Sequence, residues 1–173
     1  MRIIGLAGWS GAGKTTLIAK LIPGILGRGL RVPTLKHAHH AFDVDRPGKD
    51  SYEHRMAGAT EVLVVSEKRF ALMHELRGEA EPRLADLLAK LAPVDLVIIE
   101  GWKREPHPKL EVFRASVGKP LIHPDDPHVV AIASDVPLPN AKVPRVSLDD
   151  TVAIIDILLA RAAPLAPGRL GAA

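Results

Sequence analysis

Short apolar segments alternate with amphipathic ones along most of this chain. A run such as residues 96–99, with four consecutive large apolar side chains, is typical of a strand buried on both faces of a parallel sheet. Segments of this kind predict strands over residues 3–7, 31–36, 61–65, 70–73, 94–99, 109–113, 129–133 and 143–146. Pro33 cannot donate a hydrogen bond to a ladder, so the strand over residues 31–36 is expected at an edge of the sheet.

Apolar residues at helical spacing lie between these strands. They predict helices over residues 16–26, 51–57 and 82–91, and a last helix after the capping sequence of residues 147–150. The alternation predicts an α/β fold, with a mainly parallel sheet flanked by helices, in a single domain over residues 1–162. Residues 163–173 are mostly Ala, Pro and Gly, and we expect them to form a disordered C-terminal tail.

Composition narrows the functional classes. The absence of cysteine excludes a disulfide scaffold, an iron–sulfur cluster and a thiol nucleophile, and it fits a reducing cytoplasm, where we expect this protein. The net charge of +3 is small and aromatic residues make up only 3% of the chain, which argues against a nucleic acid partner. No apolar segment reaches the length of a membrane span, so no membrane partner is expected.

One stretch matches the phosphate-loop pattern G-x-x-x-x-G-K-[ST] at every fixed position. It follows a predicted buried strand and precedes a predicted helix, so backbone N–H groups and a helix N-terminus would together cradle an anion. Lys14 is expected to meet the β- and γ-phosphates, as a catalytic as well as a binding residue, and the Thr15 hydroxyl to ligate Mg²⁺. The predicted nucleotide-binding residues of this stretch are Gly8, Trp9, Ser10, Gly11, Ala12, Gly13, Lys14, Thr15 and Thr16. This motif predicts a nucleotide-binding protein with the P-loop NTPase fold.

An acidic residue, Glu100, ends the predicted strand that contains residues 96–99. This is the Walker B arrangement, in which a carboxylate lies near the Mg²⁺ that Thr15 also holds. Three further polar segments follow predicted strands: the phosphate loop, residues 37–51 and Asp135. Ligands of parallel sheets bind beyond the carboxyl ends of the strands, so we expect these segments and Glu100 to converge on one crevice.

These motifs together resemble a known family. The phosphate loop, Lys-His-x-His-His at 36–40, Asp-x-Asp-x-Pro-Gly-Lys-Asp-Ser at 43–51, Glu-Gly-Trp-Lys at 100–103 and Ala-Ser-Asp-Val-Pro at 133–137 resemble MobB, the GTP-binding adapter of molybdopterin guanine dinucleotide biosynthesis. The resemblance implies a homodimer that binds GTP and Mg²⁺ and hydrolyses GTP slowly at most. It also implies a molybdopterin guanylyltransferase as partner, which carries the transfer chemistry, and it leaves direct binding of molybdopterin open.

The resemblance also assigns residues. It implies that a switch-like loop senses the γ-phosphate or carries the catalytic water, and this loop contains Asp43, Asp45, Lys49, Asp50 and Ser51. Asp50 is our hypothesis for the residue that orients the water. The chain lacks the Asn/Thr-Lys-x-Asp sequence that many GTPases use for guanine, so Asp135 is assigned to the base as a hypothesis.

Several alternatives remain open from the sequence. A small-molecule kinase or an ATP-dependent ligase uses the same kind of sheet and loop, and a binding module without hydrolysis has the same motif. His37, His39 and His40 would suit a nickel or zinc metallochaperone GTPase, or they line the nucleotide crevice. The basic pair Lys103-Arg104, with Lys36 and Lys49, would meet the molybdopterin phosphate or form a solvated rim. The apolar strand that includes Phe70 and Met73 is a candidate dimer interface.

Overall fold

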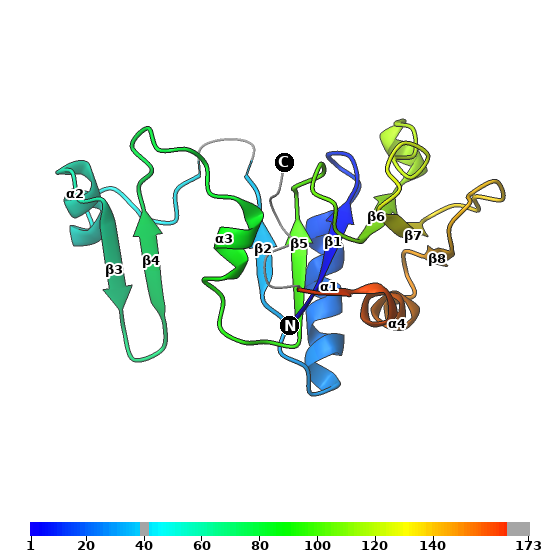
Figure 1. Ribbon diagram of the computed structural model, residues 1–173, viewed down its shortest axis with the longest axis horizontal. Helices are drawn as coiled ribbons and strands as arrows, with labels where there is room; N and C mark the ends of the chain where they lie inside the picture. Colours follow the sequence, from blue (N-terminus) through cyan, green and yellow to red (C-terminus); the bar gives the residue numbers. More distant parts are fainter. Residues whose placement is uncertain (39–41, 166–173) are drawn as a thin grey trace. The chain divides into compact units, whose positions relative to one another are not determined.

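A mainly parallel sheet organises the larger of two units in the computed structural model, which describes residues 1–38 and 42–165 (Figure 1). The larger unit contains residues 1–37 and the described residues from Leu84 onward, and the smaller unit contains the described part of residues 38–83. The sheet has the strand order β2-β5-β1-β6-β7-β8. Its strands are β1 (Arg2–Ala7), β2 (Thr34–Lys36), β5 (Leu96–Glu100), β6 (Lys109–Phe113), β7 (Val129–Ser134) and β8 (Arg145–Ser147).

Helices cover both faces of this sheet (Figure 1). Successive residues of β1 point to opposite faces, so Ile4 packs with α1 (Lys14–Gly27) and α4 (Thr151–Arg161) on one side. Ile3 packs on the other side against α3 (Leu84–Leu88). The Asp150 side chain caps α4 by accepting a hydrogen bond from the Ala153 N–H, at 2.9 Å. The predicted α/β class and the helix-flanked parallel sheet are therefore confirmed.

The register of the parallel strands decides which residues leave the sheet together. Leu6 of β1 pairs with Glu100 of β5 and with Leu110 of β6, and Lys36 of β2 also pairs with Glu100. Because these strands run in the same direction, the segments that follow them all emerge at one edge of the sheet. β2 lies at the end of the sheet, as Pro33 led us to expect.

Charged residues of β6 hold the connection to β7 in place. The fully buried Lys109 ammonium lies 2.9 Å from the Asp126 carboxylate, and the buried Glu111 carboxylate accepts hydrogen bonds from the Ile122 and His123 N–H groups. The connection over residues 114–128 is described throughout and contains one short 3-10 turn, η1 (Ala115–Val117), in place of a crossover helix. These buried interactions attach the irregular connection to the sheet.

The smaller unit consists of one helix and a two-stranded antiparallel sheet. Its elements are α2 (Asp50–Met56), β3 (Glu61–Val65) and β4 (Phe70–His74). The register pairs Leu63 with Leu72 and Val65 with Phe70, so these four side chains belong to the same face of the sheet. The predicted strand over residues 70–73 is thus present, paired with its neighbour along the chain.

The structure departs from the sequence-based expectations in three places. The predicted helix over residues 82–91 is limited to the five residues of α3. The single domain expected over residues 1–162 divides into two units, because β3 and β4 pair with each other and not with the main sheet. Ala163 and Pro164, expected to begin a disordered tail, instead form a strand, β9 (Ala163–Pro164), which pairs antiparallel with β1, and residues 166–173 of that tail lie outside the described residues.

The position of β9 has a simple physical reason. β6 pairs with β1 only at residues 5–7, so backbone groups at Arg2 and Ile3 are available on that side, and β9 pairs with them. The Leu165 N–H extends this pairing by donating to the Met1 carbonyl at 3.0 Å. No helix within residues 1–38 and 42–165 is long and apolar enough to cross a membrane.

Candidate nucleotide-binding site

The turn between β1 and α1 has the backbone conformation of an anion cradle. Gly8 (φ 147°) and Gly13 (φ 89°) both lie in the region that favours glycine, and a Cβ atom on Gly8 would come 2.6 Å from the Val112 carbonyl oxygen. Gly13 is the N-cap of α1, and no side chain among the described residues caps this helix end. The first N–H groups of a 14-residue helix are thus available to an anion.

Lys14 spans the loop from the first turn of α1. Its ammonium group donates hydrogen bonds to the Gly8 carbonyl at 2.9 Å and to the Trp9 carbonyl at 3.1 Å. Burial lowers the pKa of the Lys14 ammonium, and the attraction of the Glu100 carboxylate opposes this shift. The side chain therefore reaches back from the first turn of α1 and ties the start of the loop to the helix.

Thr15 and Glu100 meet as the sequence predicts. The Thr15 hydroxyl oxygen lies 3.3 Å and 3.4 Å from the two Glu100 carboxylate oxygens. Two adjacent ligands of an octahedral Mg²⁺ ion, each about 2.1 Å from the metal, lie about 3 Å apart. The hydroxyl and carboxylate therefore have both the chemistry and the spacing of two magnesium ligands. The Lys36 ammonium lies 3.7 Å from the same carboxylate.

The connection between β6 and β7 lies beside the phosphate loop. The Trp9 indole N–H donates to the Pro120 carbonyl at 2.8 Å, and the Lys103 ammonium lies 5.2 Å from the centre of the Trp9 ring. The Arg114 Nε atom lies 3.2 Å from the position of a Cβ atom on Gly13. The Asp135 carboxylate accepts a hydrogen bond from the Ala115 N–H at 3.0 Å. Asp135 is therefore connected to the phosphate loop through this segment.

Sequence reasoning missed Arg114. This residue directly follows a correctly predicted strand, β6, which pairs with the strand that leads into the phosphate loop. The rule that drew attention to Glu100 and Asp135, a polar residue at a strand end, also applies to Arg114.

His37 packs against the segment that follows β5. Its ring centre lies 4.9 Å from that of Trp102, and the backbone N–H of His37 donates to the Glu100 carbonyl at 2.8 Å. A Cβ atom on Gly101 (φ 102°) would come 2.5 Å from the His37 Cβ, so the two backbones approach closely here. His39 and His40 lie outside the described residues. Within residues 1–38 and 42–165, no group of three or more His, Cys, Asp or Glu side chains is arranged to bind a metal.

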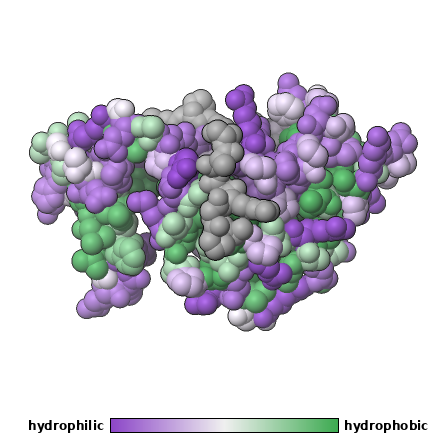
Figure 2. Space-filling model, in the orientation of Figure 1, coloured by the Kyte–Doolittle hydropathy of each residue, from purple (hydrophilic) through white to green (hydrophobic). Residues whose placement is uncertain are grey.

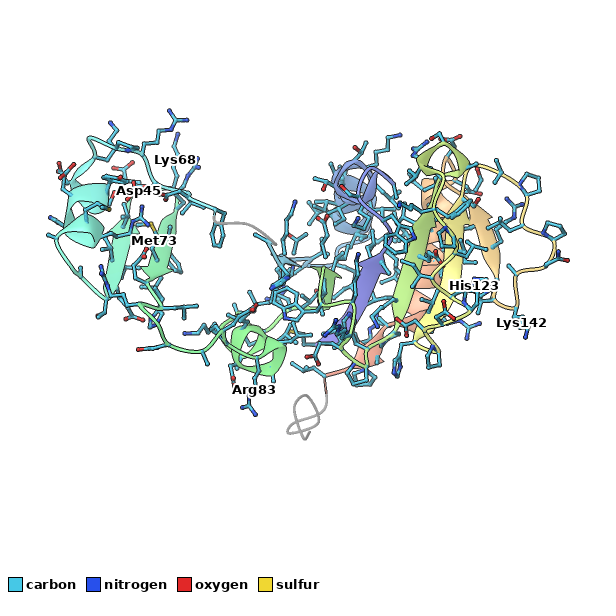
Figure 3. The ribbon with its side chains drawn as sticks, turned by 90° about the horizontal axis from the view of Figure 1, so that it is seen from above. Asp45, Lys68, Met73, Arg83, His123 and Lys142 are labelled. Carbon is cyan, nitrogen blue, oxygen red and sulfur yellow. The ribbon has the colours of Figure 1, made fainter. Side chains whose placement is uncertain are left out.

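In the smaller unit, the predicted switch-like residues divide into two groups. Asp43 and Asp45 lie 2.8 Å and 3.5 Å from the Arg55 guanidinium, and the Ser51 hydroxyl donates to Asp45 at 3.0 Å. Glu75 lies 2.7 Å from the same guanidinium, which is 12% exposed. Figure 3 shows Asp45 beside α2 in this unit. Asp43, Asp45 and Ser51 thus hold this unit together.

Lys49 and Asp50 form the second group. Both are exposed, with Lys49 at the N-cap position and Asp50 at the first position of α2. An acid at a helix N-terminus is itself favourable, so the location of Asp50 is compatible with a structural role and with a functional one.

The larger unit thus contains a complete phosphate loop, an available helix N-terminus and a carboxylate next to the threonine of the loop. This combination on a parallel sheet defines a P-loop NTPase fold. The family model described as "MobB: Molybdopterin guanine dinucleotide synthesis protein B" matches residues 3–135. The chain belongs to the MobB family.

Individual relatives agree with this assignment. The chain is 44% identical, over 91% of its length and 91% of the relative, to the molybdopterin-guanine dinucleotide biosynthesis adapter protein of Escherichia coli. It is 40% identical to the protein of the same name in Haemophilus influenzae, over 85% of this chain and 80% of that one. The crystal structure of Bacillus subtilis MobB has a TM-score of 0.71 to this chain, with 25% identity over 94% of this chain and 98% of that one.

Proposed function

We propose that this chain is a GTP-binding adapter protein of molybdopterin guanine dinucleotide biosynthesis and that it hydrolyses GTP slowly at most. The observation that carries the proposal is the intact phosphate loop with Thr15 3.3 Å from the Glu100 carboxylate, in a chain of the MobB family. Its partner would be the guanylyltransferase that attaches GMP to molybdopterin. A role that depends on GTP requires the cytoplasmic nucleotide pool, so we place the protein in the cytoplasm.

The phosphates would bind at the loop and at the first turn of α1. Lys14 would exchange its hydrogen bonds to the Gly8 and Trp9 carbonyls for bonds to the β- and γ-phosphates. Thr15 and Glu100 would hold Mg²⁺, which neutralises phosphate charge, directly or through water. Thr16 and the backbone N–H groups of residues 8–13 would complete the phosphate site.

The base would bind on the opposite side of the loop from Glu100. Glu100 ends β5 on one side of β1, whereas Asp135 follows β7, two strands away on the other side. We assign the Asp135 carboxylate to the N1–H and 2-amino group of guanine. ATP lacks this pair of donors, so it would leave the acid partly unsatisfied.

Homodimer formation would use the apolar face of β3 and β4. Leu63, Val65 and Phe70 are between 62% and 73% exposed, and Leu72 is 49% exposed, which is a large apolar surface for two strands. Figure 2 shows hydrophobic residues gathered over this part of the smaller unit. A second copy of the chain would cover the same face on its partner.

The nucleotide assignment predicts a preference for GTP. With Mg²⁺ present, the protein should bind GTP at least about tenfold more tightly than ATP, and Asp135→Ala should remove most of this difference. Lys14→Ala should weaken both nucleotides by about tenfold or more, since it removes the charged contact to the phosphates. Isothermal titration calorimetry measures these affinities. Equal affinity for ATP and GTP in the wild-type protein would refute the assignment to GTP.

The role of Asp50 is tested by hydrolysis. If Asp50 orients the attacking water, Asp50→Ala should reduce single-turnover GTP hydrolysis by roughly 100-fold while nucleotide affinity changes little. Glu53→Ala is the matched control, because Glu53 is an exposed acid on the same helix. Hydrolysis at the wild-type rate in Asp50→Ala would leave this residue without a catalytic role.

The proposed dimer interface can be tested by introducing a charged side chain into the apolar face of β3 and β4. Leu63→Glu or Phe70→Glu places a charge in the apolar face, so sedimentation velocity should show monomers where the wild-type protein forms dimers. Lys68→Glu, in the turn between β3 and β4, is the control and should leave the dimer intact. A wild-type monomer, or dimers in both apolar-face variants, would count against this interface.

A further inference from the structure

Arg114 lies between the two parts of the proposed nucleotide site. Its guanidinium lies beside the phosphate loop: a Cβ atom placed on Gly13 would be 3.2 Å from Nε, 3.7 Å from Nη2 and 3.9 Å from Cζ. On its other side, the guanidinium Nη1 atom lies 3.9 Å from the Asp135 carboxylate. The side chain is 40% exposed, so it is packed against the loop and still open to a ligand.

The cations of the site occupy different sides of the loop. Three charged groups interact electrostatically with the Lys14 ammonium. Lys36 belongs to β2, Glu100 ends β5, and Lys103 lies in the segment that follows β5. Arg114 directly follows β6, which lies on the other side of β1. A nucleotide that extends from the metal ligands at Glu100 to Asp135 therefore passes Arg114 after the β-phosphate and before the base. Of the two groups between the β-phosphate and the base, the α-phosphate is the anion that a guanidinium would bind, whereas the ribose is neutral.

We propose that Arg114 contacts the α-phosphate of the bound nucleotide and positions the Asp135 carboxylate for the base. This inference rests on the nucleotide site proposed above. A guanidinium is suited to both tasks, because its planar fork of five N–H donors can bind a phosphate oxygen on one edge and a carboxylate on another. The Ala115 N–H, one residue further on, holds the second oxygen of the same carboxylate.

The position of Arg114 is well supported by the fold. It follows directly after β6, which pairs with both β1 and β7, and the Trp9 indole of the loop donates to the carbonyl of Pro120 within the same connection. The loop, Arg114 and Asp135 are therefore connected at three points: through Trp9, through Gly13 and through Ala115. Movement of the guanidinium toward a phosphate would therefore change the position of the Asp135 carboxylate.

The two tasks predict two separable effects of Arg114→Ala. Affinity for GDP and for GTP should fall by the same factor, roughly tenfold, because both carry the α-phosphate and a charged hydrogen bond is lost in each case. The preference for GDP over ADP should also fall. In the double variant Arg114→Ala/Asp135→Ala this preference should be no lower than in Asp135→Ala alone, because both substitutions disable the same carboxylate.

Two further variants control the measurement. Lys119→Ala removes a cation from the same connection and should leave affinities and preference unchanged, since the Lys119 side chain is exposed and the neighbouring Pro120 bonds to Trp9 through its backbone carbonyl alone. Arg114→Lys keeps the charge without the fork, and it keeps the test valid if the alanine variant does not fold. It should recover part of the affinity for the phosphates but not the preference for guanine. Calorimetric titration with GDP, GTP and ADP provides all of these values.

The outcomes are distinguishable. Wild-type protein that binds none of these nucleotides would overturn both the proposed function and the role of Arg114. Tight wild-type binding of GDP, with Arg114→Ala equal to Lys119→Ala, would overturn only the role of Arg114. A loss of affinity without a loss of guanine preference would also overturn the proposal, because a purely electrostatic contribution has that effect. The combined loss, with no further decrease in the double variant, is the expected result.

Discussion

The parallel pairing of β1 with β5 on one side and β6 on the other is the constraint on which the site depends. Both neighbours pair with Leu6, so the phosphate loop after β1, Glu100 at the end of β5 and Arg114 after β6 all lie at the same edge of the sheet. The residues of β1 and β5 alternate between two apolar layers, one under α1 and α4 and one under α3, and β6 adds Leu110 and Val112 to the first of these layers. A slip of one residue would exchange the two layers, so burial of the core also fixes the geometry of the site.

This arrangement separates the residues suited to phosphates and Mg²⁺ from those assigned to the α-phosphate and the base. The lysine, threonine and glutamate that suit phosphates and Mg²⁺ lie toward β5, and the arginine and aspartate that we assign to the α-phosphate and base lie toward β7. A kinase or ligase would also need a place for an acceptor, and nothing in the described site favours those activities over the adapter role. The metallochaperone alternative rested on three histidines. Of these, His37 packs on Trp102, and His39 and His40 are outside the described residues.

Most of the larger unit could be predicted from the sequence because its signals are local. The apolar run of β5, the phosphate loop and the cap at Asp150 each specify their own structure, and the meeting of Thr15 with Glu100 follows from strand order in a parallel sheet. The position of β9 could not be predicted, since it depends on backbone groups of β1 that only the finished sheet leaves available.

Other features that the sequence did not predict also depend on contacts between residues that are apart along the chain. Asp43 and Asp45 have the spacing of a ligand-binding loop, and in this structure both lie beside Arg55, a contact that the spacing alone does not reveal. Arg114 was overlooked because a single arginine after a strand carries no pattern of its own. Its importance comes from Gly13 and Asp135, which are 101 and 21 residues away along the chain.

In the function proposed above, GTP bound at the phosphate loop would let this chain act as an adapter for a guanylyltransferase. The most direct test is to measure complex formation between the two purified proteins by analytical ultracentrifugation, with Mg²⁺ and either GTP, ATP or no nucleotide. We expect a complex that GTP strengthens and ATP does not. With the Lys14→Ala variant, GTP should not strengthen the complex. No complex under any condition, or one that forms equally with ATP, would contradict the proposed function.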